Sequence, residues 1–211
     1  MKSLVAIPAC HSSKDLDLQR ACLDTWIGKW GHLVEVKFFL GEPTFSSTPN
    51  NISLNVPDGY RELPVKVRAM FQWILDNGYD RVFKVDTDTY VHVPRLLACG
   101  KDEFDYVGRL DQADRYNHWM QGGAGYWLSR RALELLVNLP LSVWERDWRE
   151  DRIVGFAMFK SGMKISSDSK RLFDSNYPQY PSTPLPTNET ITAHKCDVAR
   201  HHAIHQAFAS I

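Results

Sequence analysis

Arg81-Val-Phe-Lys-Val-Asp-Thr-Asp-Thr-Tyr-Val91 combines a short, mostly apolar run with two carboxylates that follow it directly. We expect residues 81–85 to form a buried central strand. Side chains two positions apart on extended backbone point the same way, so Asp86 and Asp88 can converge on one hard cation, Mn²⁺ or Mg²⁺. The alternative is a pair of turn carboxylates that cap backbone amides.

Strand and helix signals alternate on both sides of this run. Strands are predicted at residues 4–7, 34–40, 104–107 and 126–128, with a short one at 52–56, and residues 90–93 should extend the central strand. Helices are predicted after Ser12 or Ser13 (Leu16, Arg20, Leu23 and Ile27 inward), from Pro64 to Gly78, after Ser129, and over 150–161. This order predicts a single α/β domain with a mostly parallel central sheet flanked by helices, whose ligands bind beyond the carboxyl ends of the strands.

Composition limits the classes of function. The 211 residues carry 25 Lys plus Arg and 25 Asp plus Glu, so bulk charge does not favour a polyanionic partner or a membrane surface. We find neither a signal peptide nor an apolar run of the roughly 20 residues that a spanning helix needs. The four cysteines lack a metal-finger or disulfide-framework spacing. We therefore expect a cytoplasmic protein with reduced thiols and no membrane anchor.

Two further segments carry candidate chemistry. Glu150 and Asp151 open a helix, where carboxylates stabilise free backbone amides; one of them could instead be a general base. The turn Gly122-Gly-Ala-Gly125 could be only a tight turn, or could let a sugar or diphosphate approach the backbone closely.

Histidines gather near the carboxyl end of the chain. His201 and His205 are one helical turn apart and His202 lies between them, whereas His194 follows a predicted late strand at 191–193. Any of them could bind a metal or lie on an exposed helix face.

Six motifs in series resemble the fringe and β-1,3-galactosyltransferase family, including its core-1 galactosyltransferase branch. They are Arg20-Ala-Cys-Leu-Asp-Thr-Trp26, Phe38-Phe-Leu-Gly41, Asp58-Gly-Tyr-Arg-Glu-Leu-Pro-Val-Lys66 with Trp73, Phe83-Lys-Val-Asp-Thr-Asp-Thr-Tyr-Val91, Gly122-Gly-Ala-Gly-Tyr-Trp-Leu-Ser129 and Glu150-Asp-Arg-Ile-Val-Gly155. Together they cover about residues 4–200, in the order that the family keeps.

The resemblance implies a GT-A fold and an inverting transfer from a UDP-sugar, with Mn²⁺ or Mg²⁺ as the cofactor. It implies that Asp88 binds the metal and that Asp86 lies beside both the nucleotide ribose and the metal. His194 looks like the family's carboxyl-terminal metal ligand, and Asp151 falls where the family keeps its base.

The resemblance further implies that Arg20, Lys66, Gly122 and Gly123 contribute to the donor site. Residues 1–93 would form the nucleotide- and metal-binding half of the domain, and residues 94–211 the acceptor-binding half. One departure is Thr87, which stands where the family has the middle aspartate of its triplet. Another is the missing membrane anchor, which favours a microbial or viral enzyme.

Three functions remain open on sequence grounds. The leading one is transfer of a hexose or N-acetylhexosamine to a glycan hydroxyl. A second keeps the chemistry but uses a hydroxylated DNA base as acceptor, with phosphate contacts from a cluster of arginines: Arg130, Arg131, Arg146, Arg149 and Arg152. Interleaved acidic residues could equally pair with those arginines on the surface. The third is an inactive module that binds sugar nucleotides or glycans. Oligomeric state is left open.

Overall fold

A computed structural model describes residues 1–42, 49–99, 101–111, 119–167, 172–174 and 189–209 of the chain. Its centre is a seven-stranded sheet with the order β10-β6-β9-β4-β1-β2-β3. The strands are β1 (Ser3–Pro8), β2 (Glu35–Gly41), β3 (Asn51–Leu54), β4 (Arg81–Lys84), β6 (Tyr106–Gly108), β9 (Tyr126–Ser129) and β10 (Ile165–Ser167). All neighbours pair in parallel except β9, which is antiparallel to both β4 and β6. The predicted mostly parallel sheet is confirmed.

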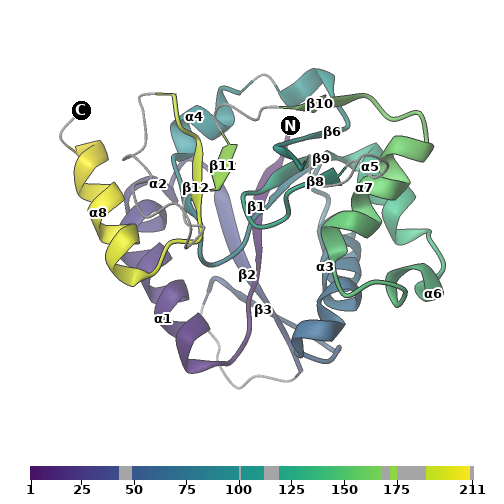
Figure 1. Ribbon diagram of the computed structural model, residues 1–211, viewed down its shortest axis with the longest axis horizontal. Helices are drawn as coiled ribbons and strands as arrows, with labels where there is room; N and C mark the ends of the chain where they lie inside the picture. The colour runs from purple at the N-terminus through teal and green to yellow at the C-terminus, as the bar shows by residue number, and fades with distance from the viewer. Residues whose placement is uncertain (43–48, 100, 112–118, 168–171, 175–188, 210–211) are drawn as a thin grey trace.

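Helices cover both faces of this sheet (Figure 1). On one side lie α1 (Ser13–Cys22), the π-helical segment η1 (Leu23–Ile27), α2 (Gly28–Trp30) and α8 (Val198–Ala209). On the other lie α3 (Leu63–Asp76), α5 (Arg130–Val137), α6 (Leu141–Trp144) and α7 (Glu150–Lys160). The short helices η2 (Tyr60–Glu62), α4 (Val93–Leu97) and η3 (Lys101–Glu103) complete the set. The architecture is a single α/β domain, as expected.

Alternation along the central strand β1 explains why both faces are covered. Leu4 and Ala6 belong to the apolar core under α3 and α5, whereas Val5 and Ile7 belong to the core under η1 and α8. All four side chains are buried. A strand that is apolar on both faces needs a helix layer on each side, which is the arrangement that a parallel sheet provides.

The predicted helices at Pro64 and Ser129 form as expected. Pro64 lies in the first turn of α3, and Gly78 follows the helix with a φ of +72°, a conformation that suits glycine. The Ser129 side chain caps α5 by accepting a hydrogen bond from the Ala132 amide at 3.2 Å. Of the two candidate caps of α1, it is Ser12 that accepts from the Asp15 amide.

The predicted buried face of α1 is wrong in part. Leu16 and Leu23 are 48% and 38% exposed, and Arg20 is exposed as well, while Leu18 and Cys22 point inward. The helix is mostly polar, so a few apolar residues gave a weak periodic signal. The large Trp26 side chain, in the η1 segment that continues α1, is fully buried.

Residues 90–93 do not extend the central strand, contrary to our expectation. Tyr90–Val91 form β5 in a separate three-stranded sheet with the order β11-β12-β5, where β11 is Leu172–Asp174 and β12 is Thr192–His194. The chain turns at the two aspartates before it reaches β5. The antiparallel register pairs Ala193 with Tyr90, so His194 lies beside the turn that carries Asp88. A further two-stranded sheet joins β7 (Leu110–Asp111) to β8 (Trp119–Met120).

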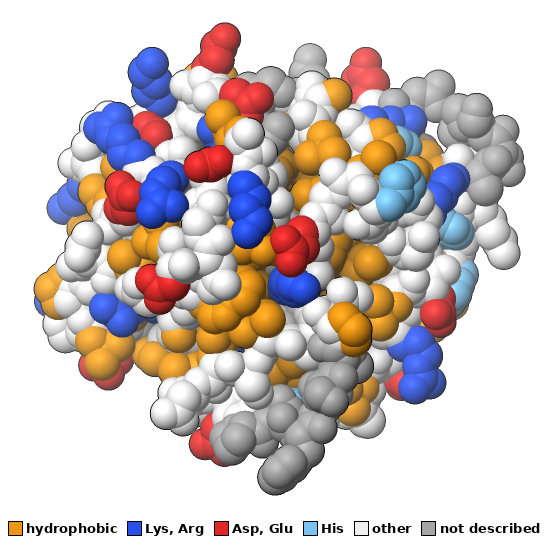
Figure 2. Space-filling model, turned by 180° about the vertical axis from the view of Figure 1, so that it is seen from behind, with side chains coloured by type: hydrophobic (Ala, Val, Ile, Leu, Met, Phe, Trp, Pro, Cys, Tyr) orange, Lys and Arg blue, Asp and Glu red, His pale blue; other side chains and the backbone are white. Residues whose placement is uncertain are grey.

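Positive and negative side chains are intermixed with apolar ones on the face of the molecule shown in Figure 2. In the described part of the chain, no helix has the length and apolar character required to cross a membrane.

Candidate active site

Three side chains that could hold a metal ion converge beyond the carboxyl end of β4. Asp86 and Asp88 lie in the turn after β4, and His194 is the last residue of β12. One ligand atom from each residue lies within 4.8 Å of those of the other two, and His194 Nε2 is 3.2 Å from Asp88 Oδ1. Two carboxylates and an imidazole form a donor set that suits a divalent cation such as Mn²⁺. The structure therefore brings the three predicted ligands together.

The Gly122–Gly125 turn packs directly against this group. A Cβ atom on Gly123 would collide with the His194 ring, and one on Gly122 would meet the Glu150 carboxylate. The Gly123 carbonyl accepts a hydrogen bond from the Thr89 hydroxyl at 2.8 Å. The glycines thus make room for the chain's own side chains. Whether Gly122 and Gly123 also contact a donor stays a prediction.

A buried lysine connects the metal group to helix α7. Lys84 Nζ lies 2.7 Å from Asp86 Oδ1, 2.7 Å from Glu150 Oε1 and 3.2 Å from the Gly122 carbonyl oxygen. Burial alone would lower the pKa of Lys84, but the two carboxylates raise it above its ordinary value, so the ammonium stays charged. The same ion pair, with a further contribution from His194, lowers the pKa of Asp86 against the opposing effect of burial.

Sequence reasoning did not single out Lys84 as a site residue. The available signal was a lysine inside a mostly apolar strand. The alternation of side chains along β4 places Lys84 on the same face of the sheet as Val82. A lysine is almost never fully buried unless it is paired.

Asp151 lies on the other side of the glycine turn from the metal group. Its Oδ2 accepts a hydrogen bond from the Gly122 amide at 3.1 Å, and its own amide donates to Glu150 Oε2 at 2.7 Å. Burial, followed by the nearby Glu150 carboxylate, raises the pKa of Asp151 to about 7. A carboxylate with such a pKa can exchange a proton at neutral pH, which is the property of a general base.

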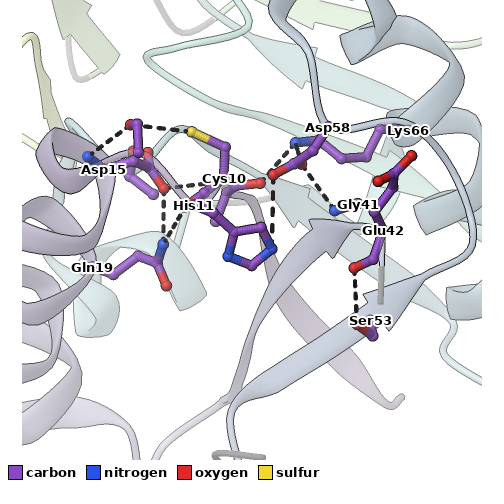
Figure 3. A network of polar contacts seen from close by, with 12 residues as sticks. Cys10, His11, Asp15, Gln19, Gly41, Glu42, Ser53, Asp58 and Lys66 are labelled. Atoms are coloured by element: carbon purple, nitrogen blue, oxygen red, sulfur yellow. Dashed lines mark hydrogen bonds and ion pairs between the residues drawn. The ribbon is translucent and has the colours of Figure 1, made fainter. Parts of the chain in front are cut away.

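Thr87 makes a contact that accounts for its place in the acidic turn. Its hydroxyl donates a hydrogen bond to Asp15 Oδ1 at 2.6 Å. Asp15 Oδ2 in turn accepts from the Cys10 amide and from Gln19 Nε2, both at 2.8 Å (Figure 3). An aspartate at position 87 would face the Asp15 carboxylate, so a hydroxyl is the compatible group here. Asp15 was not predicted from the sequence, because no local pattern pairs it with residue 87.

Lys66 lies at the carboxyl ends of β1 and β2, where its ammonium is already bound. It donates to the Ala9 carbonyl and to Asp58 Oδ1, both at 2.7 Å, and Asp58 Oδ1 also accepts from the Gly41 amide at 2.9 Å (Figure 3). The lysine therefore holds α3 against the ends of both strands. Its predicted contact with a donor is not tested by this geometry.

Whether Arg20 contacts a donor stays a prediction. Arg20 lies on the exposed side of α1, and among the described residues its side chain makes no hydrogen bond or ion pair with Asp86, Asp88 or Asp151. To contact a donor, the Arg20 side chain would have to extend from the exposed side of α1 to the group of possible metal ligands.

Of the four histidines near the carboxyl end of the chain, His194 belongs to the group of possible metal ligands. The other three lie on α8 and do not belong to it. His205 Nδ1 lies 3.0 Å from the Tyr90 hydroxyl, and His202 is exposed. His201 is fully buried, and that burial lowers its pKa to about 4, so it packs as a neutral ring beside Tyr90. Within the described residues, the group that could hold a metal contains His194 and none of these three.

Solved structures share this architecture over nearly the whole chain. The chain is similar to the crystal structure of a glycosyltransferase involved in glycosylation of the major capsid of PBCV-1, with 12% identity, a TM-score of 0.58, and coverage of 98% of this chain and 100% of that chain. It is also similar to the galactosyltransferase LgtC in complex with donor and acceptor sugar analogues, with 11% identity, a TM-score of 0.57, and coverage of 97% and 95%. No family model matches the sequence. The chain therefore has a GT-A-like glycosyltransferase fold, which confirms the predicted fold class.

Replacing Lys84 with methionine should destabilise the protein. Lys84→Met leaves the Asp86 and Glu150 carboxylates without the cation between them, and breaking a buried ion pair in this way costs roughly 3–5 kcal/mol. We expect the thermal midpoint to fall by roughly 6–20 °C in calorimetry or circular dichroism. Adding Glu150→Gln should restore part of the loss, because one uncompensated charge disappears. A single variant with wild-type stability would contradict the role of Lys84.

Replacing Gly123 with alanine should weaken metal binding while the chain stays folded. The new methyl group displaces the His194 ring, so Mn²⁺ affinity measured by calorimetry or electron paramagnetic resonance should fall roughly 10- to 100-fold. His194→Ala should produce a similar loss, and the double variant should lose little more, because both changes remove the same ligand. Additive losses would show that the glycine acts through another contact.

Proposed function

We propose that the chain is a metal-dependent, inverting glycosyltransferase that moves a hexose or N-acetylhexosamine from a UDP-sugar to a hydroxyl of a glycan, in the manner of the fringe and β-1,3-galactosyltransferase family. The observation that carries the proposal is the pairing of two groups across one glycine turn. A donor set for a divalent cation lies on one side, and Asp151, with a pKa of about 7, lies on the other.

The metal group and the base would divide the reaction between them. Asp86, Asp88 and His194 would hold Mn²⁺ or Mg²⁺, which when bound would offset the charge that develops on the departing diphosphate. Asp151 would accept the proton of the acceptor hydroxyl as its oxygen bonds to the anomeric carbon and the bond from that carbon to the UDP oxygen breaks. A single displacement from the face opposite the leaving group inverts the anomeric centre.

We also propose that the domain divides into a nucleotide-binding half and an acceptor-binding half. Residues 1–93 supply Asp86, Asp88 and the Lys66 network, and would bind the nucleotide together with Arg20, Gly122 and Gly123. Residues 94–211 supply Asp151 and would bind the acceptor. His194 comes from the second half but would complete the metal site of the first.

Charge pairing favours a glycan over DNA as the acceptor. Four of the five arginines near α5 and α7 are paired: Arg130 with Glu134, Arg131 with Asp105, and both Arg149 and Arg152 with Asp147. An arginine that is already held by a carboxylate must give up that partner to bind a phosphate. An inactive module is disfavoured because both the metal donor set and the base carboxylate are present.

Asp88→Ala should abolish metal-dependent UDP binding and transfer. Removing one carboxylate leaves one carboxylate and one imidazole, too few protein ligands to hold Mn²⁺ beside a diphosphate. Calorimetry of UDP binding with and without Mn²⁺ measures the effect. Equal, metal-enhanced UDP affinity in wild type and variant would overturn the metal assignment.

Asp151→Asn should lower the transfer rate by roughly 10²- to 10⁴-fold, because an amide cannot accept the proton. In the wild type, kcat/KM should rise as pH increases through about 7, since the base must be deprotonated, and this limb should vanish in the variant. Pre-steady-state or steady-state assays across pH 5.5–8.5, roughly the range centred on that pKa, provide the measurement.

The matched control for this variant is Glu145→Gln, which removes an exposed carboxylate from the segment before α7. It should transfer sugar at the wild-type rate. Glu150 is unsuitable as a control because it binds Lys84 and the Asp151 amide. If folded Asp151→Asn kept near wild-type activity, Asp151 would have only its role at the start of α7.

A further inference from the structure

Two exposed aromatic side chains meet beside the candidate active site. Tyr60 is 72% exposed and Trp148 is 47% exposed, yet their ring centroids lie 5.4 Å apart at an angle of 42°. Tyr60 begins η2, and Trp148 lies in the segment between α6 and α7. The contact joins two segments that are far apart in the sequence and leaves much of both rings open to solvent.

The positions of both residues in the chain place this pair next to the reacting groups. Trp148 lies just before α7, which begins at Glu150 and Asp151. Tyr60 follows Asp58, which binds Lys66 at the ends of β1 and β2 (Figure 3). Partial burial, followed by Asp86, Glu150 and Asp151, raises the pKa of the Tyr60 phenol, so the ring lies within electrostatic reach of the acidic cluster.

The Trp148 ring is also held in place from its own segment. The Arg149 guanidinium lies 5.2 Å from the Trp148 ring centroid. Asp147 fixes that guanidinium through two hydrogen bonds, at 3.1 Å from Nε and 3.2 Å from Nη2. An exposed aromatic ring that is held by a neighbour loses little conformational freedom when a ligand packs on it.

We propose that Tyr60 and Trp148 form a stacking platform for a pyranose ring of the acceptor, beside the base Asp151. The proposal rests on the proposed function and names the acceptor class of the same site: a glycoside whose sugar ring presents a face of C–H groups. Such a face packs on an aromatic ring, while the hydroxyls at its edge hydrogen-bond to polar neighbours.

Charge around the platform favours a neutral sugar over a nucleic-acid base, although bases also stack on aromatic rings. Asp86, Glu150 and Asp151 each act on the Tyr60 phenol by charge, and Arg149 and Arg152 share Asp147. A strand of phosphates would meet these carboxylates there, and both arginines already hold the single Asp147 carboxylate. A glycoside brings no charge, so it avoids that repulsion.

The test combines a direct binding signal with kinetics. The indole N–H resonance of Trp148, assigned by its loss in Trp148→Phe, should shift when methyl pyranosides of glucose, galactose, mannose and N-acetylglucosamine are titrated into the protein with Mn²⁺ and UDP. In transfer assays with a responding glycoside, Trp148→Ala and Tyr60→Ala should raise the acceptor KM by roughly 10- to 100-fold and change kcat much less. Trp148→Phe should recover most of the loss, because it retains an aromatic face.

Phe156→Ala, which removes another exposed aromatic side chain of α7, is the matched control and should leave KM unchanged. Metal-dependent UDP binding tests the proposed function separately. If UDP binds but no glycoside shifts the Trp148 signal, or the alanine variants keep the wild-type acceptor KM, the platform is wrong and the proposed function stands. A salt-sensitive shift with a thymidine oligonucleotide and none with glycosides would likewise overturn the platform.

Discussion

The buried ammonium of Lys84 is the interaction on which the rest of the site depends. One positive charge lies between a carboxylate of the metal group, Asp86, and a carboxylate of helix α7, Glu150. Without the cation between them, these two carboxylates would repel each other strongly, because little water is present to screen their charges. Because the Lys84 ammonium also binds the Gly122 carbonyl, the acidic turn, the glycine turn and the start of α7 are held in one arrangement.

The direction of one strand explains how these parts meet. β9 is the antiparallel strand of the seven-stranded sheet, so its first residues lie at the edge where the neighbouring parallel strand β4 ends. The Gly122–Gly125 turn immediately precedes β9 and therefore lies beside the two aspartates. Asp151 and the Asp86–Asp88–His194 group come from distant parts of the sequence, but the glycine turn contacts both Asp151 and His194.

The polar contacts around the site also explain why a threonine is compatible with the centre of the acidic turn. Thr87 occupies the centre of the Asp86–Asp88 turn and binds Asp15, whose other oxygen accepts hydrogen bonds from Cys10 and Gln19. A hydroxyl donor at position 87 and a carboxylate at position 15 are complementary, whereas two carboxylates would repel.

Local pattern was enough to predict the alternation of strands and helices, the helix that begins at Pro64 and the cap at Ser129, because spacing and turn chemistry act over a few residues. The motifs also indicated Asp86, Asp88, Asp151 and His194. The tertiary structure alone decided which face of α1 is buried, that Tyr90–Val91 leave the central sheet for a second one, and that Lys84 and Asp15 hold the site together. It alone brought Tyr60 against Trp148. These features depend on contacts between segments far apart in the chain, and local periodicity contains no information about such contacts.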